Sequence, residues 1–262
     1  MPEKPLYDAL IARIFRNHYR QGAEEFEFDR DEIERVAAQL KLRLPKNLGD
    51  LIYSFRYRKD LPREILRTAT GKKQWVIQPA GRSKYRFQLT RISRIVPRED
   101  LVAVKIPDST PEIITSYALS DEQALLAKVR YNRLVDIFLG ITTYSLQNHL
   151  RTTVKGVGQI EIDEIYVGVN KNGQQFVIPV QAKGGNDQLA VVQTQQDLAC
   201  CAEKFPALAC RAISAQFMKE DVIAMFELAL EADEVKVVEE RHYRLVASDT
   251  ITAADLKTYS NR

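Results

Sequence analysis

Two short stretches decide how this chain folds: QIEIDEIYV, residues 159–167, and QFVIPVQAK, residues 175–183. Both are rich in β-branched and apolar residues, so we expect each to form a strand. The residues between them include Asn170-Lys171-Asn172-Gly173. Because Asn-Gly in a short loop favours a tight reversal of the chain, the two strands are expected to form a hairpin.

The polar residues of this hairpin fall on alternating positions. Side chains two residues apart in a strand project from the same face. Glu161 and Asp163 therefore share a face of the first strand, and Gln181 and Lys183 share a face of the second. The hairpin predicts two acids, an amide and a lysine gathered among Ile and Val, which is a candidate metal site.

This arrangement resembles the core of the PD-(D/E)xK nuclease superfamily, to which most type II restriction endonucleases and many DNA repair nucleases belong. The resemblance covers about residues 120–246. In the family pattern a strand acid is followed, one hairpin later, by Glu or Asp, any residue, and Lys. Asp163 matches the first acid and Lys183 matches the lysine, whereas Gln181 replaces the second acid. Some restriction enzymes of the superfamily carry Gln there, but an amide brings no charge to a divalent cation, so loss of activity stays open.

The resemblance implies a catalytic set of Asp163, Gln181 and Lys183, with Mg²⁺ as the cofactor. Asp163 and Gln181 would bind the metal, and Lys183 would orient the attacking water and stabilise charge on the phosphate. Glu122 and Glu161 are further candidate metal ligands, Glu122 because many members hold an acid on the helix before the hairpin. Each of these residues also has an alternative without catalysis. These are an Asp163 that faces solvent at the strand edge, a Gln181 that is hydrogen-bonded without a metal, a Lys183 that only pairs with Asp163, a Glu161 that is solvated or packed beside Lys155, and a Glu122 that only complements the helix dipole.

The composition is that of a globular protein, with 262 residues, 45% hydrophobic and 28% charged. This length accommodates one large domain or two ordinary ones. No run approaches the roughly 18 apolar residues of a membrane span and no apolar signal core opens the chain, so we expect a cytoplasmic protein. Cys200, Cys201 and Cys210 lie in apolar surroundings and are expected to be buried free thiols. The absence of a Gly-Lys-Ser/Thr phosphate loop argues against ATP dependence.

The net charge of +3 conceals an uneven distribution along the chain. Residues 1–98 hold 22 Lys and Arg against 12 Asp and Glu, whereas residues 99–262 hold 16 against 23. Within the basic part, residues 41–98 contain 16 basic and 3 acidic side chains. Such an excess indicates contact with phosphate groups, so the N-terminal part is the candidate DNA-binding region.

The N-terminal part predicts three helices followed by a hairpin. Apolar residues at helical spacing place the helices at about residues 5–20, 31–40 and 48–58, and Asp29 or Asp31 is the expected cap of the second. Pro45-Lys46-Asn47 separates the second helix from the third, and alternation over residues 74–78 and 84–89 predicts the hairpin.

This order resembles the winged helix-turn-helix, whose third helix enters the major groove while the hairpin follows the DNA backbone. A small helical domain that only packs on the nuclease domain is the alternative. The candidate DNA-contacting residues are Tyr53, Arg56, Tyr57, Arg58, Arg82 and Lys84.

We therefore expect an α/β protein, with a restriction-endonuclease-like mixed sheet flanked by helices and preceded by a small winged-helix domain. The expected parts are a DNA-binding domain at 1–95, a connecting segment at 96–118 that includes a strand or edge segment near residues 101–106, and a nuclease-like domain at 119–262. In the last part we expect a long helix opened by Ser120 and continuing to Phe138. After the hairpin we expect a helix at 188–204, a strand at 208–217, a helix at 222–230 and a strand or hairpin at 235–246.

The expected function is that of a Mg²⁺-dependent double-stranded DNA endonuclease, with a type II restriction enzyme as its biological form. One active site per chain cuts one strand, so duplex cleavage implies a homodimer, and a cognate DNA methyltransferase encoded nearby would be its partner. Two alternatives are a DNA-binding regulator whose nuclease-like domain is inactive, and a repair or junction nuclease without base specificity. Gln181 is the feature that favours the regulator.

Overall fold

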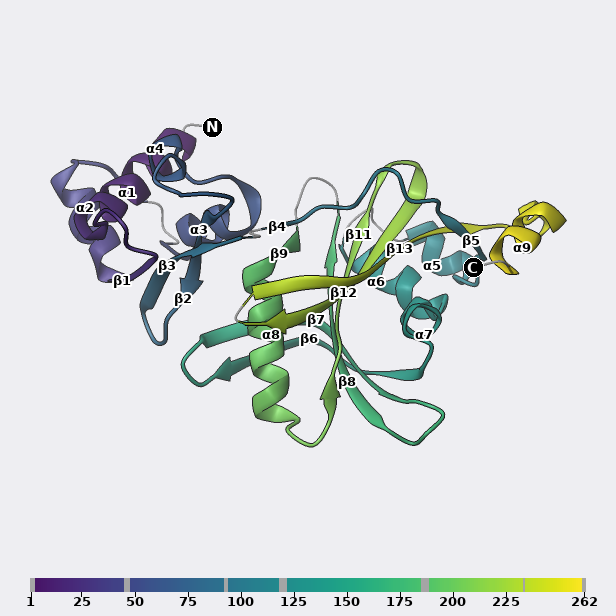
Figure 1. Cartoon of the computed structure of the whole chain (residues 1–262). Helices are drawn as coiled ribbons and strands as arrows, with labels where there is room; N and C mark the ends of the chain where they lie inside the picture. The colour runs from purple at the N-terminus through teal and green to yellow at the C-terminus, as the bar shows by residue number, and fades with distance from the viewer. Residues whose placement is uncertain are drawn as a thin grey trace. The chain divides into compact units, whose positions relative to one another are not determined.

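The structure is a computed structural model that describes residues 3–44, 48–91, 94–117, 122–184, 189–232 and 234–260 (Figure 1). The chain divides into two compact units. Unit 1 consists of Met1–Arg94, Thr152–Ile160 and Ala190–Gln196, and unit 2 consists of Ile95–Arg151, Glu161–Leu189 and Asp197–Arg262. The first division falls beside the expected boundary after residue 95, but two later segments of the expected nuclease-like domain belong to unit 1.

Unit 1 is built from short helices and a three-stranded antiparallel sheet of order β1-β3-β2. Its elements are α1 (Glu3–His18), β1 (Glu25–Asp29), α2 (Asp31–Gln39), α3 (Leu48–Tyr53), a π-helical turn η1 (Ser54–Arg58), α4 (Arg63–Leu66), β2 (Gln74–Pro79) and β3 (Lys84–Thr90). The three predicted helices and the predicted hairpin are confirmed. The predicted Asp cap of α2 is wrong, because Arg30 occupies the N-cap position without a side-chain capping bond. Residues 45–47, the expected helix break, lie outside the described residues.

The core of unit 1 joins the apolar stripe of α1 to the sheet. Leu10, Ile11 and Ile14 of α1 are fully buried, as their helical spacing predicts. Phe15 packs edge-on against Trp75 of β2 and Phe87 of β3, with ring centroids 5.2 and 5.1 Å away. Such aromatic pairs add to the stability that buried area provides, so α1 and the hairpin form one packed unit.

Unit 2 is organised around a large mixed sheet of order β5-β13-β12-β11-β8-β7-β6, with β10 also paired to β8. The strands are β5 (Val104–Pro107), β6 (Thr142–Val154), β7 (Gly158–Val169), β8 (Gln175–Lys183), β10 (Ala209–Cys210), β11 (Ala212–Phe217), β12 (Val222–Glu231) and β13 (Glu234–Val246); two-residue strands β4 (Arg94–Ile95) and β9 (Leu189–Ala190) lie outside it. The β8–β11 and β13–β5 pairs are parallel, and the β7–β8, β11–β12 and β12–β13 pairs are antiparallel.

Helices flank this sheet on both faces (Figure 1). The helical elements are α5 (Glu112–Tyr117), α6 (Glu122–Tyr131), α7 (Leu134–Leu139), α8 (Val191–Lys204), α9 (Ala253–Ser260) and the short turns η2 (Lys219–Asp221) and η3 (Ser248–Thr250). Val180 and Ala182 of β8 share a core cluster with Leu125 of α6 and Leu134 of α7. The side chain of Gln181, which projects from the opposite face of β8, is hydrogen-bonded to α8. The α/β class with a mixed sheet between helices is therefore confirmed.

The hairpin predicted around Asn170–Gly173 is present, and β8 has the expected bounds. Asn170 organises the turn, because its Oδ1 accepts hydrogen bonds from the backbone N atoms of Asn172 and Gln174, at 2.9 and 3.0 Å. Gly173 has φ +78°, a conformation that glycine adopts at little cost. The Asn-Gly signal thus fixes both the reversal and the register of β7 against β8.

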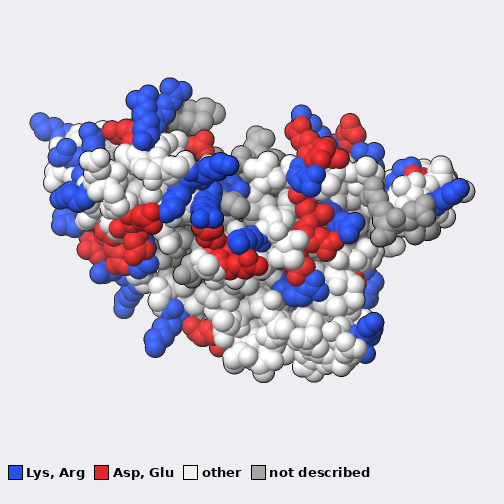
Figure 2. Space-filling model, viewed as in Figure 1, with Lys and Arg blue, Asp and Glu red and all other residues white. Residues whose placement is uncertain are grey.

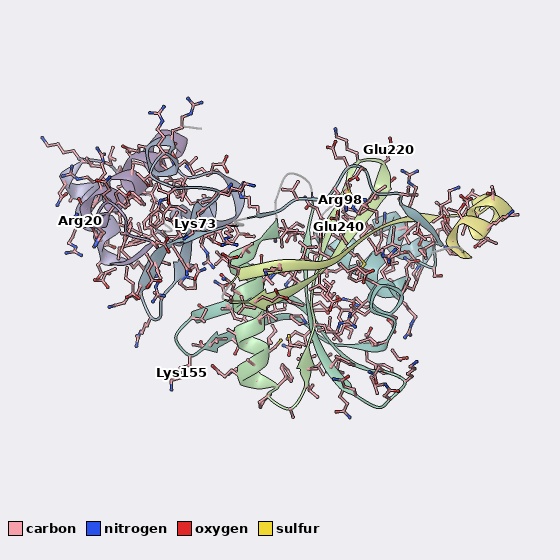
Figure 3. All side chains as sticks on the ribbon, in the orientation of Figure 1. Arg20, Lys73, Arg98, Lys155, Glu220 and Glu240 are labelled. Atoms are coloured by element: carbon pink, nitrogen blue, oxygen red, sulfur yellow. The ribbon has the colours of Figure 1, made fainter. Side chains whose placement is uncertain are left out.

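The segment expected to connect two domains is part of unit 2. Its strand β5 pairs in parallel with β13 at the edge of the sheet. The backbone N of Arg98 donates to Glu240 Oε1 of β13, at 2.8 Å, and both residues are labelled in Figure 3. This segment therefore extends the sheet through β5 and contacts β13 through Arg98.

Two predictions of secondary structure are wrong. Val222–Leu230, expected as a helix, lies in β12, because this segment pairs with strands on both sides and has buried residues on both faces. The long helix expected through Phe138 is interrupted at Arg133, whose φ of +50° ends α6 and starts α7. Ser120, its expected cap, lies outside the described residues. Strand β6 was not expected, since most of its residues are polar and exposed.

Two further observations concern the chain as a whole. None of the described helices is long and apolar enough to cross a membrane. The three cysteines are free thiols, as predicted, with Cys200 and Cys201 buried and Cys210 partly exposed.

Candidate functional site

Three of the residues singled out in the sequence meet where β7 and β8 part. The register pairs Glu164 with Val180, so Asp163 and Gln181 are the next residues on the two strands. Asp163 Oδ2 accepts a hydrogen bond from the backbone N of Ala182, at 2.9 Å. Asp163, Gln181 and Lys183 are all buried, with exposed fractions of 9%, 1% and 4%. Two strands of the central sheet thus hold these polar groups in a fixed arrangement.

Glu122 joins this group from the first turn of α6. Lys183 Nζ lies 2.8 Å from Glu122 Oε1, and the glutamate side chain remains about one-third exposed at 34%. Burial raises the pKa of Asp163 above its ordinary value, and the positive charge of Lys183 opposes that rise. The ammonium of Lys183 therefore interacts with a partly exposed carboxylate and with a buried one.

A further carboxylate, Asp197, was not anticipated. It lies on α8, where its Oδ2 accepts a hydrogen bond from the side-chain amide of Gln181. Burial raises the pKa of Asp197 well above its ordinary value, and the nearby charge of Asp163 adds to the rise. The sequence did hold a signal, because Cys200 and Cys201 follow three and four positions later and place Asp197 on the buried stripe of the helix.

Several buried oxygen atoms on and near the side chain of Gln181 have no hydrogen-bond partner. Within the described part of the chain they include Gln181 Oε1, Asp197 Oδ1 and Ser214 Oγ. Ser214 on β11 is the register partner of Gln181, so the two side chains project from the same face of the sheet. Buried oxygens seldom stay without a partner, and oxygen atoms are the ligands that Mg²⁺ prefers. These oxygen atoms therefore fit the coordination of a divalent cation.

This set contains two carboxylates, those of Asp163 and Asp197. Among the described residues, no group of three or more His, Cys, Asp or Glu side chains is arranged to hold a metal ion. The oxygens available on the Gln181 face are those of Asp163 and Asp197, the Gln181 amide and the Ser214 hydroxyl. Two carboxylates and neutral oxygens are compatible with Mg²⁺, which usually keeps several of its water ligands.

Glu161 has a different environment from Asp163, although the two residues share a strand face. Its carboxylate is exposed, forms an ion pair with Arg151 Nε at 3.1 Å, and lies 3.4 Å from His149 Nδ1; both residues are on β6. The positive charge of Arg151 offsets the charge of Glu161 at the surface. Nothing in its surroundings requires a metal ion.

The candidate DNA-contacting residues are distributed over unit 1. Tyr53 is 40% exposed. Arg56, Arg82 and Lys84 line one cavity of about 600 Å³. The side chains of Tyr57 and Arg58 lie outside the described part of the structure. Figure 2 shows basic side chains over the face of unit 1 turned to the viewer, with a group of acidic side chains among them.

Comparison of the chain with protein-family models, with curated proteins and with solved structures found no match. The geometry of the site is therefore the basis for a functional assignment.

Proposed function

We propose that this protein is a Mg²⁺-dependent endonuclease that cleaves double-stranded DNA. The supporting observation is the buried group of Asp163, Gln181 and Lys183 at the point where β7 and β8 part, with Asp197 beside Gln181. Carboxylate, amide and lysine in this arrangement resemble the PD-(D/E)xK nuclease site. A bound cation would favour the ionised form of Asp197, which would place a negative charge next to the position where Gln181 replaces an acid.

The proposed chemistry is hydrolysis of a phosphodiester bond by water. A bound Mg²⁺ would lower the pKa of a ligand water and neutralise charge on the phosphate. Asp163, Asp197 and the amide oxygen of Gln181 would hold the ion. Lys183 would donate a hydrogen bond to the attacking water or to a phosphate oxygen, and Glu122 would orient the lysine through their 2.8 Å contact.

The proposed DNA-binding region is the part of unit 1 formed by residues 1–94. Its order of helix, strand, three helices and hairpin, with β1 paired to β3, supports a winged-helix arrangement. The excess of basic residues over 41–98 supports contact with DNA phosphates. A type II restriction enzyme acting as a homodimer is the biological form that this proposal favours.

Incubation of the protein with plasmid DNA and Mg²⁺ tests the proposal. Discrete fragments support a restriction enzyme, and a smear supports a nuclease without base specificity. Lys183→Ala should lower the cleavage rate by about 100-fold or more while DNA binding is retained, because it removes a group that stabilises charge at the reacting centre. Lys171→Ala, which removes an exposed lysine from the β7–β8 turn, is the matched control. Cleavage by Lys183→Ala at the wild-type rate would show that the site is wrongly assigned.

One observation favours a second candidate, a DNA-binding regulator with an inactive nuclease-like domain. The amide of Gln181 donates to Asp197 and Lys183 is paired with Glu122, so both side chains have partners within the protein. A regulator would bind DNA tightly without cleaving it at any Mg²⁺ concentration. The plasmid experiment distinguishes the two functions.

A further inference from the structure

Unit 1 contains a cavity that is lined by cationic side chains from four segments of the chain. The cavity has a volume of about 600 Å³ and includes Arg30, Arg56, Arg82, Lys84 and Lys155 in its lining. We call it the basic cavity. No acidic side chain is found among the described residues that line it. Four of these cations come from the N-terminal part, whereas Lys155 belongs to the turn between β6 and β7, labelled in Figure 3.

Two turns form adjoining parts of the basic cavity. The turn between β2 and β3 contains Gly81, and the turn between β6 and β7 leads to Gly158; both belong to unit 1. A Cβ atom built on Gly158 would lie 3.5 Å from the carbonyl oxygen of Gly81, so the two backbones approach closely. The backbone N of Arg30 donates to the carbonyl of Ser83, at 2.9 Å, which places Arg30 against the same turn.

The gathering of these cations around one cavity favours the binding of an anion. Like charges brought together around one concave surface repel one another, and a bound anion offsets that repulsion. Arg30, Arg82 and Lys84 are exposed, so their charges are accessible from solvent. The glycines at positions 81 and 156 have open space where a side chain would lie, which allows a ligand to approach the backbone. The cavity is thus accessible to a ligand that carries several negative charges.

We infer that the basic cavity binds consecutive backbone phosphates of double-stranded DNA, and that the β6–β7 turn is part of the DNA-binding surface. This inference rests on the proposed function and extends it to residues outside the N-terminal domain. A DNA backbone carries one charge per phosphate along a continuous line, which matches cations placed on separate segments around an open cavity. Phosphate contacts of this kind position DNA without selecting its sequence.

The test measures how DNA affinity depends on salt. The full-length protein is titrated into fluorescent duplex DNA without divalent cations, so that no cleavage occurs, at a series of salt concentrations. Log affinity falls linearly with log salt concentration, so its slope is negative. Arg30→Ala and Lys155→Ala should each make this slope less negative by about 0.9, and the double variant by about twice that. The loss of affinity should be equal for two duplexes of unrelated sequence.

Controls separate this effect from damage to the fold. Lys171→Ala removes an exposed lysine from a different turn and should leave the slope unchanged. Lys155→Gln keeps much of the side chain and should reproduce the slope of Lys155→Ala if the charge is what matters. A wild-type slope in Arg30→Ala and in both Lys155 variants, or the absence of duplex binding by the wild-type protein, would overturn the inference. A competition experiment with micromolar tripolyphosphate or ATP gives a further test. If these compounds displace DNA from the wild-type protein but not from the double variant, the cavity selects a small polyphosphate and the inference is overturned.

Failure of this inference and failure of the nuclease proposal give different results. Cleavage of plasmid DNA with Mg²⁺, combined with unchanged salt slopes in the variants, would contradict the inference but support the nuclease proposal. Less negative slopes in the variants without any cleavage by the wild-type protein would support the phosphate site and contradict the nuclease proposal.

Discussion

Gln181 of β8 donates its side-chain amide to the carboxylate of Asp197 on α8, and both side chains are almost completely buried. This hydrogen bond joins a central strand of the sheet to the helix on one of its faces. It leaves one oxygen of each side chain without a partner among the described residues. A buried carboxyl group with an unpartnered oxygen is costly to ionise. The protonation state of Asp197 therefore reports on the chemistry of the site.

The first prediction concerns the stability of the metal-free protein as the pH rises. Burial raises the pKa of Asp197 above its ordinary value of 3.8, so the folded state holds the proton more tightly than the unfolded state does. The free energy of unfolding should therefore fall as the pH rises from about 3.8 toward the raised pKa, because the unfolded state loses its proton first. Asp197→Asn removes this titration and should flatten the decline. Denaturant unfolding in EDTA over a series of pH values measures it.

Asp249→Asn provides the control, because Asp249 is exposed in a short helical turn. It should show the same pH dependence as the wild-type protein. Asp163→Asn should also reduce the decline, since burial raises the pKa of Asp163. An unchanged decline in Asp197→Asn would show that Asp197 is already ionised in the folded metal-free protein.

The second prediction concerns the residue that departs from the nuclease pattern. Gln181→Glu replaces the amide donor with a second carboxyl group in contact with Asp197. The metal-free variant should lose about 1–3 kcal/mol of stability, because a buried hydrogen bond is replaced by two competing acids. Mg²⁺ should raise the melting temperature of this variant more than that of the wild-type protein. Thermal unfolding with and without Mg²⁺ measures both effects, and an equal response to Mg²⁺ would argue against metal binding at Gln181.

The hairpin of β7 and β8 could be predicted because its signals are local. Alternation identifies the strands, and Asn170 and Gly173 fix the turn, so β8 begins and ends where the sequence indicates. The juxtaposition of Asp163 with Gln181 follows from that register. Asp197 reaches the same site through the packing of α8 on the sheet. The local pattern places it on the buried stripe of the helix but does not show which strand it faces. The relation between Gln181 and Asp197 is a tertiary contact over sixteen positions of the chain.

The error at β12 has a different physical origin. Its residues Val222 to Phe226 are all buried, so the polar and apolar alternation of a one-sided strand is absent. The reversal before it uses Glu220 and Asp221, with φ of +58° and +56°, in place of Gly or Asn-Gly. Without a turn signal and without alternation, a continuous apolar run is read equally well as a buried helix. Only the neighbouring strands β11 and β13 decide between the two.

The third prediction separates the two acids on β7. Glu161→Gln should leave the rate of plasmid cleavage within about twofold of the wild-type value, because an exposed ion pair with Arg151 contributes little. Asp163→Asn should lower the rate by at least about 100-fold, because it removes a carboxylate from the proposed metal site. Single-turnover cleavage at saturating Mg²⁺ compares them. A large loss in Glu161→Gln would indicate that Glu161 contributes to the site once metal or DNA is bound.

The last prediction distinguishes two roles for Glu122. Its carboxylate contacts Lys183 Nζ at 2.8 Å, and it also lies near enough to Asp163 to raise the pKa of that acid. If Glu122 orients Lys183, Glu122→Gln should lower the cleavage rate by about tenfold, because the lysine loses a charged partner. The Mg²⁺ concentration that gives half of the maximal rate should then change by less than about twofold. A metal ligand behaves differently: its loss raises the Mg²⁺ requirement, and high Mg²⁺ restores much of the rate. Cleavage rates over a wide range of Mg²⁺ concentrations therefore assign Glu122 to the lysine or to the metal, and the geometry favours the lysine.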